Sequence, residues 1–152
     1  MMKRRALNSN GFSLIRKIFT RRELKGNLGR DFLAPTRIYV KPVLALLEQI
    51  QLRGIVNITG GGFIDNLPRV MPEGLGVEIW KKSWSVPPIF ERVQKRGAIS
   101  ASEMMRTFNL GIGMILIVKA EDAARAQHAL GRMKLPNWVI GEIVKGRGVE
   151  VR

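Results

Sequence analysis

The spacing of apolar residues along the chain predicts helices in six segments. In each segment an apolar residue recurs at every third or fourth position, which places the apolar side chains on one helical face. The segments are residues 12–20, 42–51, 63–71, 87–95, 100–108 and 121–133. Proline is expected in the first turn of two of these helices, at Pro42 and Pro87, because its missing N–H is harmless there.

Capping residues and one buried face can also be predicted for these helices. Ser9 or Asn10 is expected to cap the helix at 12–20, since short polar side chains accept hydrogen bonds from the first free N–H groups. Ser100 and Glu103 have the spacing of a capping box. The buried stripe of the helix at 42–51 is expected to contain Val43, Leu44, Leu46, Leu47 and Ile50.

Five shorter apolar segments predict strands, at residues 55–58, 75–80, 112–118, 138–144 and 148–151. The third of these, 112–118, is the most apolar. We therefore expect it to be a central strand that is covered on both faces. The two longer connections, 21–35 and 81–86, are interpreted as loops, and the first of them is polar and contains glycine.

The order of these elements predicts an α+β fold, with helices packed on the faces of a mixed β-sheet. Hydrophobic residues make up 45% of the sequence and charged residues 25%, which is ordinary for a globular protein. No internal boundary is visible, so residues 1–152 are expected to form a single domain.

Composition excludes several kinds of site. The chain has no cysteine, which rules out disulfides and thiolate metal sites and fits a cytoplasmic protein. It has one histidine, His128, which we interpret as a surface residue, so a triad or multi-histidine metal centre is not expected. The longest apolar run, 110–118, is too short to cross a membrane, and no secretory signal is visible.

Positive charge is concentrated at the start of the chain. The net charge is +14, and residues 1–30 contribute +8 of it, from nine Lys or Arg and one acid, Glu23. Such a surface attracts polyanions at long range, so nucleic acid, anionic lipid and phosphorylated small molecules are all candidate partners. A solvated basic surface with no ligand explains the same composition.

The motif with the clearest chemistry is the glycine-rich sequence Thr59-Gly60-Gly61-Gly62, which follows a predicted strand and precedes a short helix. Glycine lets the backbone adopt positive φ and approach a ligand closely. Successive N–H groups at such a turn form an anion site, to which the Thr59 hydroxyl can add. The alternative is a tight turn that binds nothing. The motif lacks the Gly-Lys-Ser/Thr of a P-loop.

Polar residues near this turn and in two other segments are further candidates for substrate contact. Asn66 and Arg69 lie just beyond the glycines, and Arg69 could bind a phosphate or pair with Asp65 four residues earlier. Ser9 and Asn10 could face a substrate rather than cap a helix. Thr107 and Asn109, at a helix–strand junction, could face a cleft or only end the helix.

Together these segments resemble the C-terminal domain of phosphoribosylformylglycinamidine cyclo-ligases, also called AIR synthetases. The matching sequences occur in the family's order and cover about residues 7–151. They are Ser9–Leu14, Pro35–Pro42, Thr59–Val70, Arg106–Met114 and Val139–Glu142, of which Thr59–Val70 (TGGGFIDNLPRV) is the most specific. The resemblance implies the AIR synthetase C-terminal-domain fold, which is partly ferredoxin-like.

The resemblance also implies an activity and a partner. The family closes the ring of formylglycinamidine ribonucleotide in an ATP-dependent reaction of purine biosynthesis and yields 5-aminoimidazole ribonucleotide. An N-terminal domain, which holds ATP and Mg²⁺ and much of the dimer interface, has no counterpart in this sequence. We therefore expect a separately encoded or missing N-terminal half, a possible homodimer, and little activity from the chain alone. No metal ligand is expected in this half.

The resemblance further implies roles for the candidate residues. Thr59 and Gly60–Gly62 would cradle a phosphate, Asn66 and Arg69 would support it, and Ser9, Asn10, Thr107 and Asn109 would line the substrate side. The family usually has histidine at the position of Asn8. Asparagine cannot transfer a proton near neutral pH, so this substitution is expected to weaken any function that needs one.

Two other functions remain open. The chain could be a non-catalytic basic module that binds RNA or another polyanion. No nucleic-acid motif and no interleaving of aromatic and basic residues supports this, so nucleic acid is the less favoured partner. The arginine-rich start could be a transit peptide, but the family resemblance from Leu7 onward argues against that. A neighbouring gene for the other half would favour the enzyme, and salt-sensitive RNA binding would favour the module.

Overall fold

The computed structural model describes residues 11–152, and it confirms the α+β class. Its helices are α1 (Phe12–Ile18), α2 (Arg21–Lys25), α3 (Asn27–Phe32), α4 (Val40–Leu47), α5 (Gly62–Asn66), α6 (Pro88–Gly97), α7 (Ala101–Thr107) and α8 (Ala123–Arg132), with 3-10 helices η1 (Leu67–Val70) and η2 (Ala120–Asp122). Its strands are β1 (Gly54–Asn57), β2 (Leu75–Ile79), β3 (Met114–Ile117), β4 (Gly141–Lys145) and β5 (Val149–Val151).

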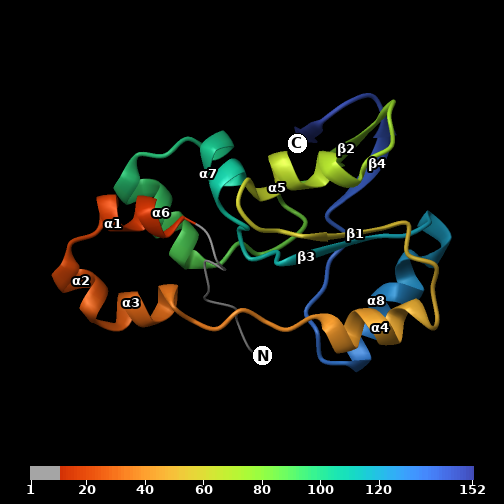
Figure 1. The fold of residues 1–152 in the computed structure, drawn as a ribbon, viewed down its shortest axis with the longest axis horizontal. Helices are drawn as coiled ribbons and strands as arrows, with labels where there is room; N and C mark the ends of the chain where they lie inside the picture. The colour runs from red at the N-terminus through yellow and green to blue at the C-terminus, as the bar shows by residue number, and fades with distance from the viewer. Residues whose placement is uncertain (1–10) are drawn as a thin grey trace.

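The strands form two small sheets rather than one. Strands β1 and β3 pair antiparallel, with Val56 opposite Ile115. The second sheet has the order β4-β2-β5, in which β2 is antiparallel to β4 and parallel to β5. In Figure 1 the β1–β3 pair crosses the middle of the molecule, with α1–α3, α6 and α7 toward one end and α4 and α8 toward the other.

The prediction that residues 112–118 form a central, fully covered strand is wrong. Strand β3 has β1 as its one partner in the described part of the chain, and all four of its residues are partly exposed. The prediction failed because an apolar run does not reveal how many neighbours a strand has. The last predicted strands are also shorter than expected, and Trp138 and Val139 are exposed ahead of β4.

The main hydrophobic core lies among α1, α5, α6, α7 and the two sheets. Three fully buried phenylalanines form part of it, Phe63, Phe90 and Phe108, and the rings of the last two lie 5.9 Å apart. A smaller cluster joins α4 to α8 through Leu46, Ile50, Ala126 and Ala129. The main core therefore contains side chains from both halves of the sequence.

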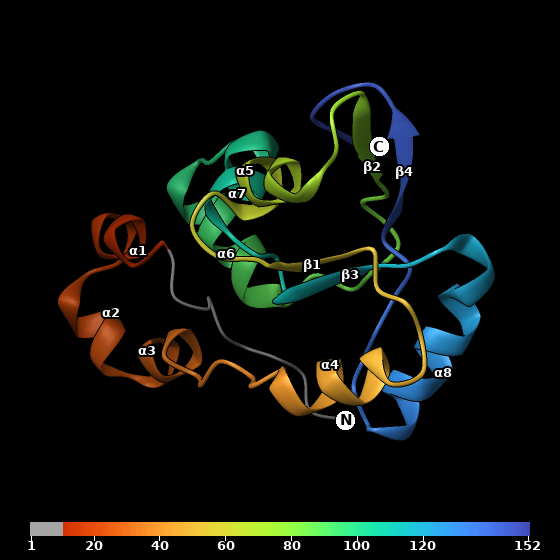
Figure 2. The same cartoon turned by 45° about the vertical axis from the view of Figure 1, so that its right-hand side comes forward.

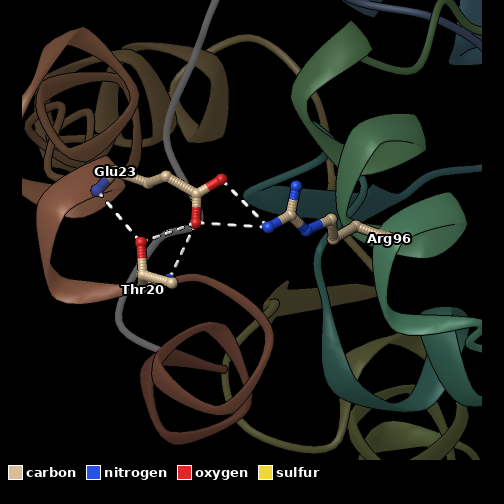
Figure 3. A network of polar contacts seen from close by, with 3 residues as sticks. All are labelled: Thr20, Glu23 and Arg96. Atoms are coloured by element: carbon tan, nitrogen blue, oxygen red, sulfur yellow. Dashed lines mark hydrogen bonds and ion pairs between the residues drawn. The ribbon is translucent and has the colours of Figure 1, made fainter.

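The segment 21–35 forms helices α2 and α3, so its interpretation as a loop is wrong. Helix α2 is started by a capping box: the Glu23 N–H donates to the Thr20 hydroxyl at 3.3 Å, and the Thr20 N–H donates to the Glu23 carboxylate at 2.8 Å. Figure 3 shows this pair together with Arg96 of α6, whose guanidinium lies 3.0 Å from the same carboxylate. Phe32 of α3 is buried, which anchors the segment on the core.

Two predictions about helix ends and faces also need correction. Helix α4 begins at Val40 and ends at Leu47, and Leu44 and Leu47 are exposed while Leu46 and Ile50 are buried. The predicted stripe was too wide: α4 packs against α8 (Figure 2), and this contact buries Leu46 and Ile50 but not Leu44 or Leu47. The residue before α1 is Gly11, at φ 76°. The predicted capping residues Ser9 and Asn10 lie outside the described residues.

The other predicted helices are confirmed, with ends shifted by a few residues. Ser100 caps α7 by accepting from the Glu103 N–H at 3.2 Å, and Pro88 begins α6. In the part of the chain that the structure describes, no helix is long and apolar enough to cross a membrane.

Candidate functional site

The glycine-rich motif forms a tight turn between β1 and α5. Gly61 and Gly62 have φ of 94° and 53°, in the left-handed region that favours glycine. The Gly62 N–H donates to the Thr59 carbonyl at 3.1 Å, which closes the turn. Gly60 is exposed, and, apart from its two chain neighbours, no atom of the described residues lies within 4 Å of the position that a Cβ would take there. The backbone at Gly60 is thus open to a ligand.

Asn66 holds this turn in shape. Its side chain is 4% exposed, and its amide nitrogen donates to the carbonyls of Gly60 at 3.0 Å and Gly62 at 2.7 Å. Its side-chain oxygen accepts from the Thr59 hydroxyl at 3.3 Å. These contacts use both amide donors and one of the two acceptor positions of the oxygen, so Asn66 acts as a structural clamp under the turn.

Two glycines bring other motifs against the end of α7. A Cβ on Gly62 would lie 2.0 Å from the Met105 carbonyl oxygen, so α5 and α7 meet backbone to backbone. A Cβ on Gly11 would lie 2.1 Å from the Phe108 ring, so the start of α1 also packs there. Three motifs that are far apart in the sequence therefore meet around residues 105–108.

Asn109 shapes the turn that follows α7. It is 4% exposed, and its side-chain oxygen accepts from the Gly111 N–H at 3.0 Å. Thr107 is partly exposed, but its hydroxyl donates to Glu103 of its own helix at 2.8 Å. Of these two predicted contacts, Asn109 positions the backbone, and Thr107 is the one that reaches the surface.

Trp84 is a residue of this region that sequence reasoning missed. It lies in the 81–86 connection, is 6% exposed, and donates from its indole nitrogen to the Leu110 carbonyl at 3.0 Å. Its ring lies 5.7 Å from that of Phe63 in α5. Trp84 thus joins the Asn109 turn to the glycine turn. A tryptophan inside a polar loop was the available signal, since so large an apolar surface is seldom left in water.

Two charged side chains flank the turn. The Asp65 carboxylate folds back toward Gly61, where a Cβ would lie 2.8 Å from a carboxylate oxygen. Arg69 is exposed in η1 and makes no ion pair with any described residue. The alternative role, pairing with Asp65, is therefore not observed. Arg69 is therefore available to an anion. Ser9 and Asn10 lie outside the described residues.

The arrangement can bind and orient a ligand. Within residues 11–152 no hydrogen bond engages the N–H groups of Gly60 and Gly61, and unpaired N–H groups at a glycine turn suit a phosphate oxygen. The same residues include no group of three or more His, Asp or Glu that could hold a metal ion. His128 is exposed on α8, remote in the fold from the turn.

A large cavity of the described chain lies elsewhere. Its volume is about 1380 Å³, and it runs along the open edge of β3 between α8 and the β4-β2-β5 sheet. Its lining is mostly apolar and includes none of the residues Thr59–Gly62. Its size would favour this cavity as the functional site. The unpaired N–H groups and the meeting of three motifs favour the glycine turn instead.

Comparison with known proteins gives consistent results. The family model for the C-terminal domain of AIR synthase related proteins matches residues 1–152. A phosphoribosylformylglycinamidine cyclo-ligase of Caldicellulosiruptor saccharolyticus is 45% identical over 93% of the chain, and a chloroplastic one of Arabidopsis thaliana is 44% identical over 94%. The chain spans 45% and 39% of these relatives, less than half of their length.

A solved structure supports the fold. A crystal structure of a protein from Thermus thermophilus superposes with a TM-score of 0.55 at 23% sequence identity. The match covers 81% of this chain and 38% of that one.

Proposed function

The chain belongs to the family of AIR synthase related C-terminal domains, and on this basis we propose that it is the C-terminal half of a phosphoribosylformylglycinamidine cyclo-ligase. The proposed reaction closes the ring of formylglycinamidine ribonucleotide, coupled to ATP hydrolysis, in purine biosynthesis. The observation that carries the proposal is 45% identity to a cyclo-ligase over 93% of the chain. The proposed compartment is the cytoplasm.

The proposed role of the glycine turn is to bind a phosphate group of the substrate or of ATP. Support comes from the open backbone at Gly60 and from the unengaged N–H groups of Gly60 and Gly61. Asp65 would repel an anion at Gly61, so we assign the phosphate to the Gly60 side of the turn. Arg69 would supply the balancing positive charge.

The other candidate residues have different proposed roles. Asn66 and Asn109 would position backbone atoms, because their side chains are buried and already hydrogen-bonded. Thr107 would contact the substrate directly, and the Thr59 hydroxyl would do so after leaving its 3.3 Å bond to Asn66. Ser9 and Asn10 remain proposed contacts on the substrate side. None of these residues is assigned a bond-making step, because the protein's part in such a reaction is largely positioning.

ATP and Mg²⁺ are assigned mainly to the part of the relatives that this sequence does not span. Among residues 11–152 no group of three or more His, Asp or Glu could hold a metal ion. A complementary N-terminal half, on the same or another polypeptide, would then be the partner of this chain. A homodimer is possible through that half.

The test is a cyclisation assay with formylglycinamidine ribonucleotide, ATP, Mg²⁺ and K⁺. The purified chain is assayed alone and with the N-terminal half of the Caldicellulosiruptor saccharolyticus relative. We expect product only on mixing. A parallel Asn8→His variant tests whether asparagine at this position limits the rate, and we expect the variant to be faster.

The other outcomes are equally informative. Product from the chain alone would overturn the assignment of ATP and Mg²⁺ to the other half. No product from either mixture, with circular dichroism showing a folded chain and with the relative's own two halves active together, would overturn the cyclo-ligase proposal for this chain.

A further inference from the structure

A groove lined by basic side chains separates α2 and α3 from α6. Its volume is about 990 Å³, and Arg22, Arg92, Lys95 and Arg96 are among its lining residues. All four are exposed. The sequence places Arg22 some 70 residues before the other three, so only the fold brings the charges together. The sequence of residues 1–30 has a net charge of +8, and α6 adds three further bases to this groove, Arg92, Lys95 and Arg96.

The acidic side chains of this region are already engaged. Glu23 lies 3.0 Å from Arg96 (Figure 3), and Glu91 lies 3.3 Å from Lys95. No ion pair engages Arg22 or Arg92 within the described part of the chain. Four more exposed bases belong to α1 and α2: Arg16, Lys17, Arg21 and Lys25. This surface therefore has more basic than acidic side chains, and Arg22 and Arg92 have no ion-pair partner among the described residues.

Thr20 and Glu23 give this surface a fixed shape. The capping box starts α2, and the Glu23–Arg96 ion pair ties α2 to α6 across 73 residues of sequence. The Arg96 guanidinium also lies 5.5 Å from the centre of the Phe19 ring. Because Arg96 is held from two sides, the groove is prearranged for a ligand instead of being a set of independent side chains.

We propose that this groove binds the phosphate backbone of single-stranded nucleic acid, independently of base sequence. Charges spread over three helices suit a polymeric anion better than a single phosphate. The aromatic side chain at the groove, Phe19, is 5% exposed, so it cannot stack on a base and no sequence reading is expected.

An acidic protein is the less favoured partner. Protein interfaces have cores depleted of charged residues and anchored by apolar or aromatic side chains. The exposed residues of this groove are instead mostly charged, as Arg22, Glu91 and Arg92 illustrate, with Pro88 as an exposed apolar residue among them. This composition matches the polar, positively charged surfaces that contact nucleic acid.

The experiment measures binding of the full chain to a fluorescein-labelled single-stranded RNA of random sequence, by anisotropy, at several KCl concentrations. If the two unpaired groove bases, Arg22 and Arg92, neutralise two phosphates, log Kobs falls against log[KCl] with a slope of about −1.4. Affinity then drops about 7-fold between roughly 50 and 200 mM salt. A DNA strand of the same sequence should bind with the same slope.

Variants locate the site. The double variant Arg22→Gln/Arg92→Gln should reduce the slope to about zero, because both phosphate contacts of the unpaired bases are lost. The matched control is Arg132→Gln/Arg147→Gln, which removes the same charge from the end of α8 and from the β4–β5 connection, far from the groove in Figure 1. This control should leave the slope within about 0.3 of the unmodified chain. Equal melting curves by circular dichroism establish that both variants are folded.

Three results would overturn the proposal. The first is no binding at the lowest salt, and the second is an equal effect of the two double variants, which would indicate diffuse attraction only. The third is displacement of the RNA by an acidic peptide at an equal concentration of charge, which would point to a protein partner.

Discussion

Replacing Asn66 with alanine tests whether the glycine turn depends on the clamp beneath it. The substitution removes the amide that donates to the Gly62 carbonyl at 2.7 Å and to the Gly60 carbonyl at 3.0 Å. Each such bond contributes about 0.5–1.5 kcal/mol net, and a buried carbonyl left without a donor costs about 1–3 kcal/mol. The Gly60 carbonyl can regain water because that residue is exposed, whereas the Gly62 carbonyl is buried.

We therefore expect Asn66→Ala to lower the free energy of unfolding by about 2–4 kcal/mol. The assay is urea denaturation followed by circular dichroism, with the slope m compared between variants to verify that the surface exposed on unfolding is unchanged. Asn66→Asp keeps the shape but sets carboxylate oxygens against two carbonyl oxygens. At neutral pH, Asn66→Asp should lower the free energy of unfolding by at least as much as Asn66→Ala does.

The matched control for this experiment is Asn57→Ala in β1, where the same side chain is exposed. We expect a change within about 0.5 kcal/mol there. If Asn66→Ala changed the stability no more than Asn57→Ala did, the hydrogen bonds to the two glycine carbonyls would not stabilise the turn. The clamp interpretation would then be refuted.

Three further substitutions probe other contacts. Gly62→Ala should destabilise by about 2–4 kcal/mol in the same urea assay, because its Cβ would meet the Met105 carbonyl; a smaller loss would mean that α5 and α7 can separate. Trp84→Phe should cost about 1–2 kcal/mol by removing the donor to the Leu110 carbonyl, and unchanged stability would refute that role. The Thr20 hydrogen bonds lower the pKa of Glu23 below 4.5. Its stabilising effect is therefore complete above that pH and lost as pH falls through the lowered pKa. The stability difference between the chain and Glu23→Gln should shrink between about pH 6 and pH 3, and a constant difference would contradict this.

Sequence patterns predicted local structure well where the cause of the structure is local. The helix α7 was predicted from Ser100 and Glu103, three residues apart, and the structure has the Ser100 cap. The same type of signal, Thr20 and Glu23, starts α2, but it was not recognised because the surrounding residues are polar and glycine-rich. Burial of Phe32 and Leu24 against a core supplied by distant residues stabilises that segment, and a local pattern does not reveal it.

The candidate site was predicted as a set of segments but not as an arrangement. The glycine motif and Asn66 were identified together, and the structure places them in contact. Their geometry makes Asn66 a buried clamp on the turn, and its contribution to ligand binding stays a prediction. The contribution of Trp84 could not be predicted because its partner, Leu110, lies 26 residues further along the chain.

Sheet architecture was the least predictable part. Alternation and apolar content predict that a segment is a strand, but the number of neighbours depends on residues elsewhere. Strand β3 is more apolar than β2, yet β2 is the strand with two partners. Pairing was decided by the late strands β4 and β5, whose sequences contain no feature that specifies β2 as their partner.

The order β4-β2-β5 has a consequence for how the chain folds during synthesis. Val77 of β2 pairs with Ile143 on one side and Val149 on the other, 66 and 72 residues further along. While those residues are still being translated, both edges of β2 present unpaired N–H and C=O groups. Contacts of such long sequence separation form slowly, and exposed strand edges favour aggregation. The helices can form early, but the β4-β2-β5 sheet is completed last.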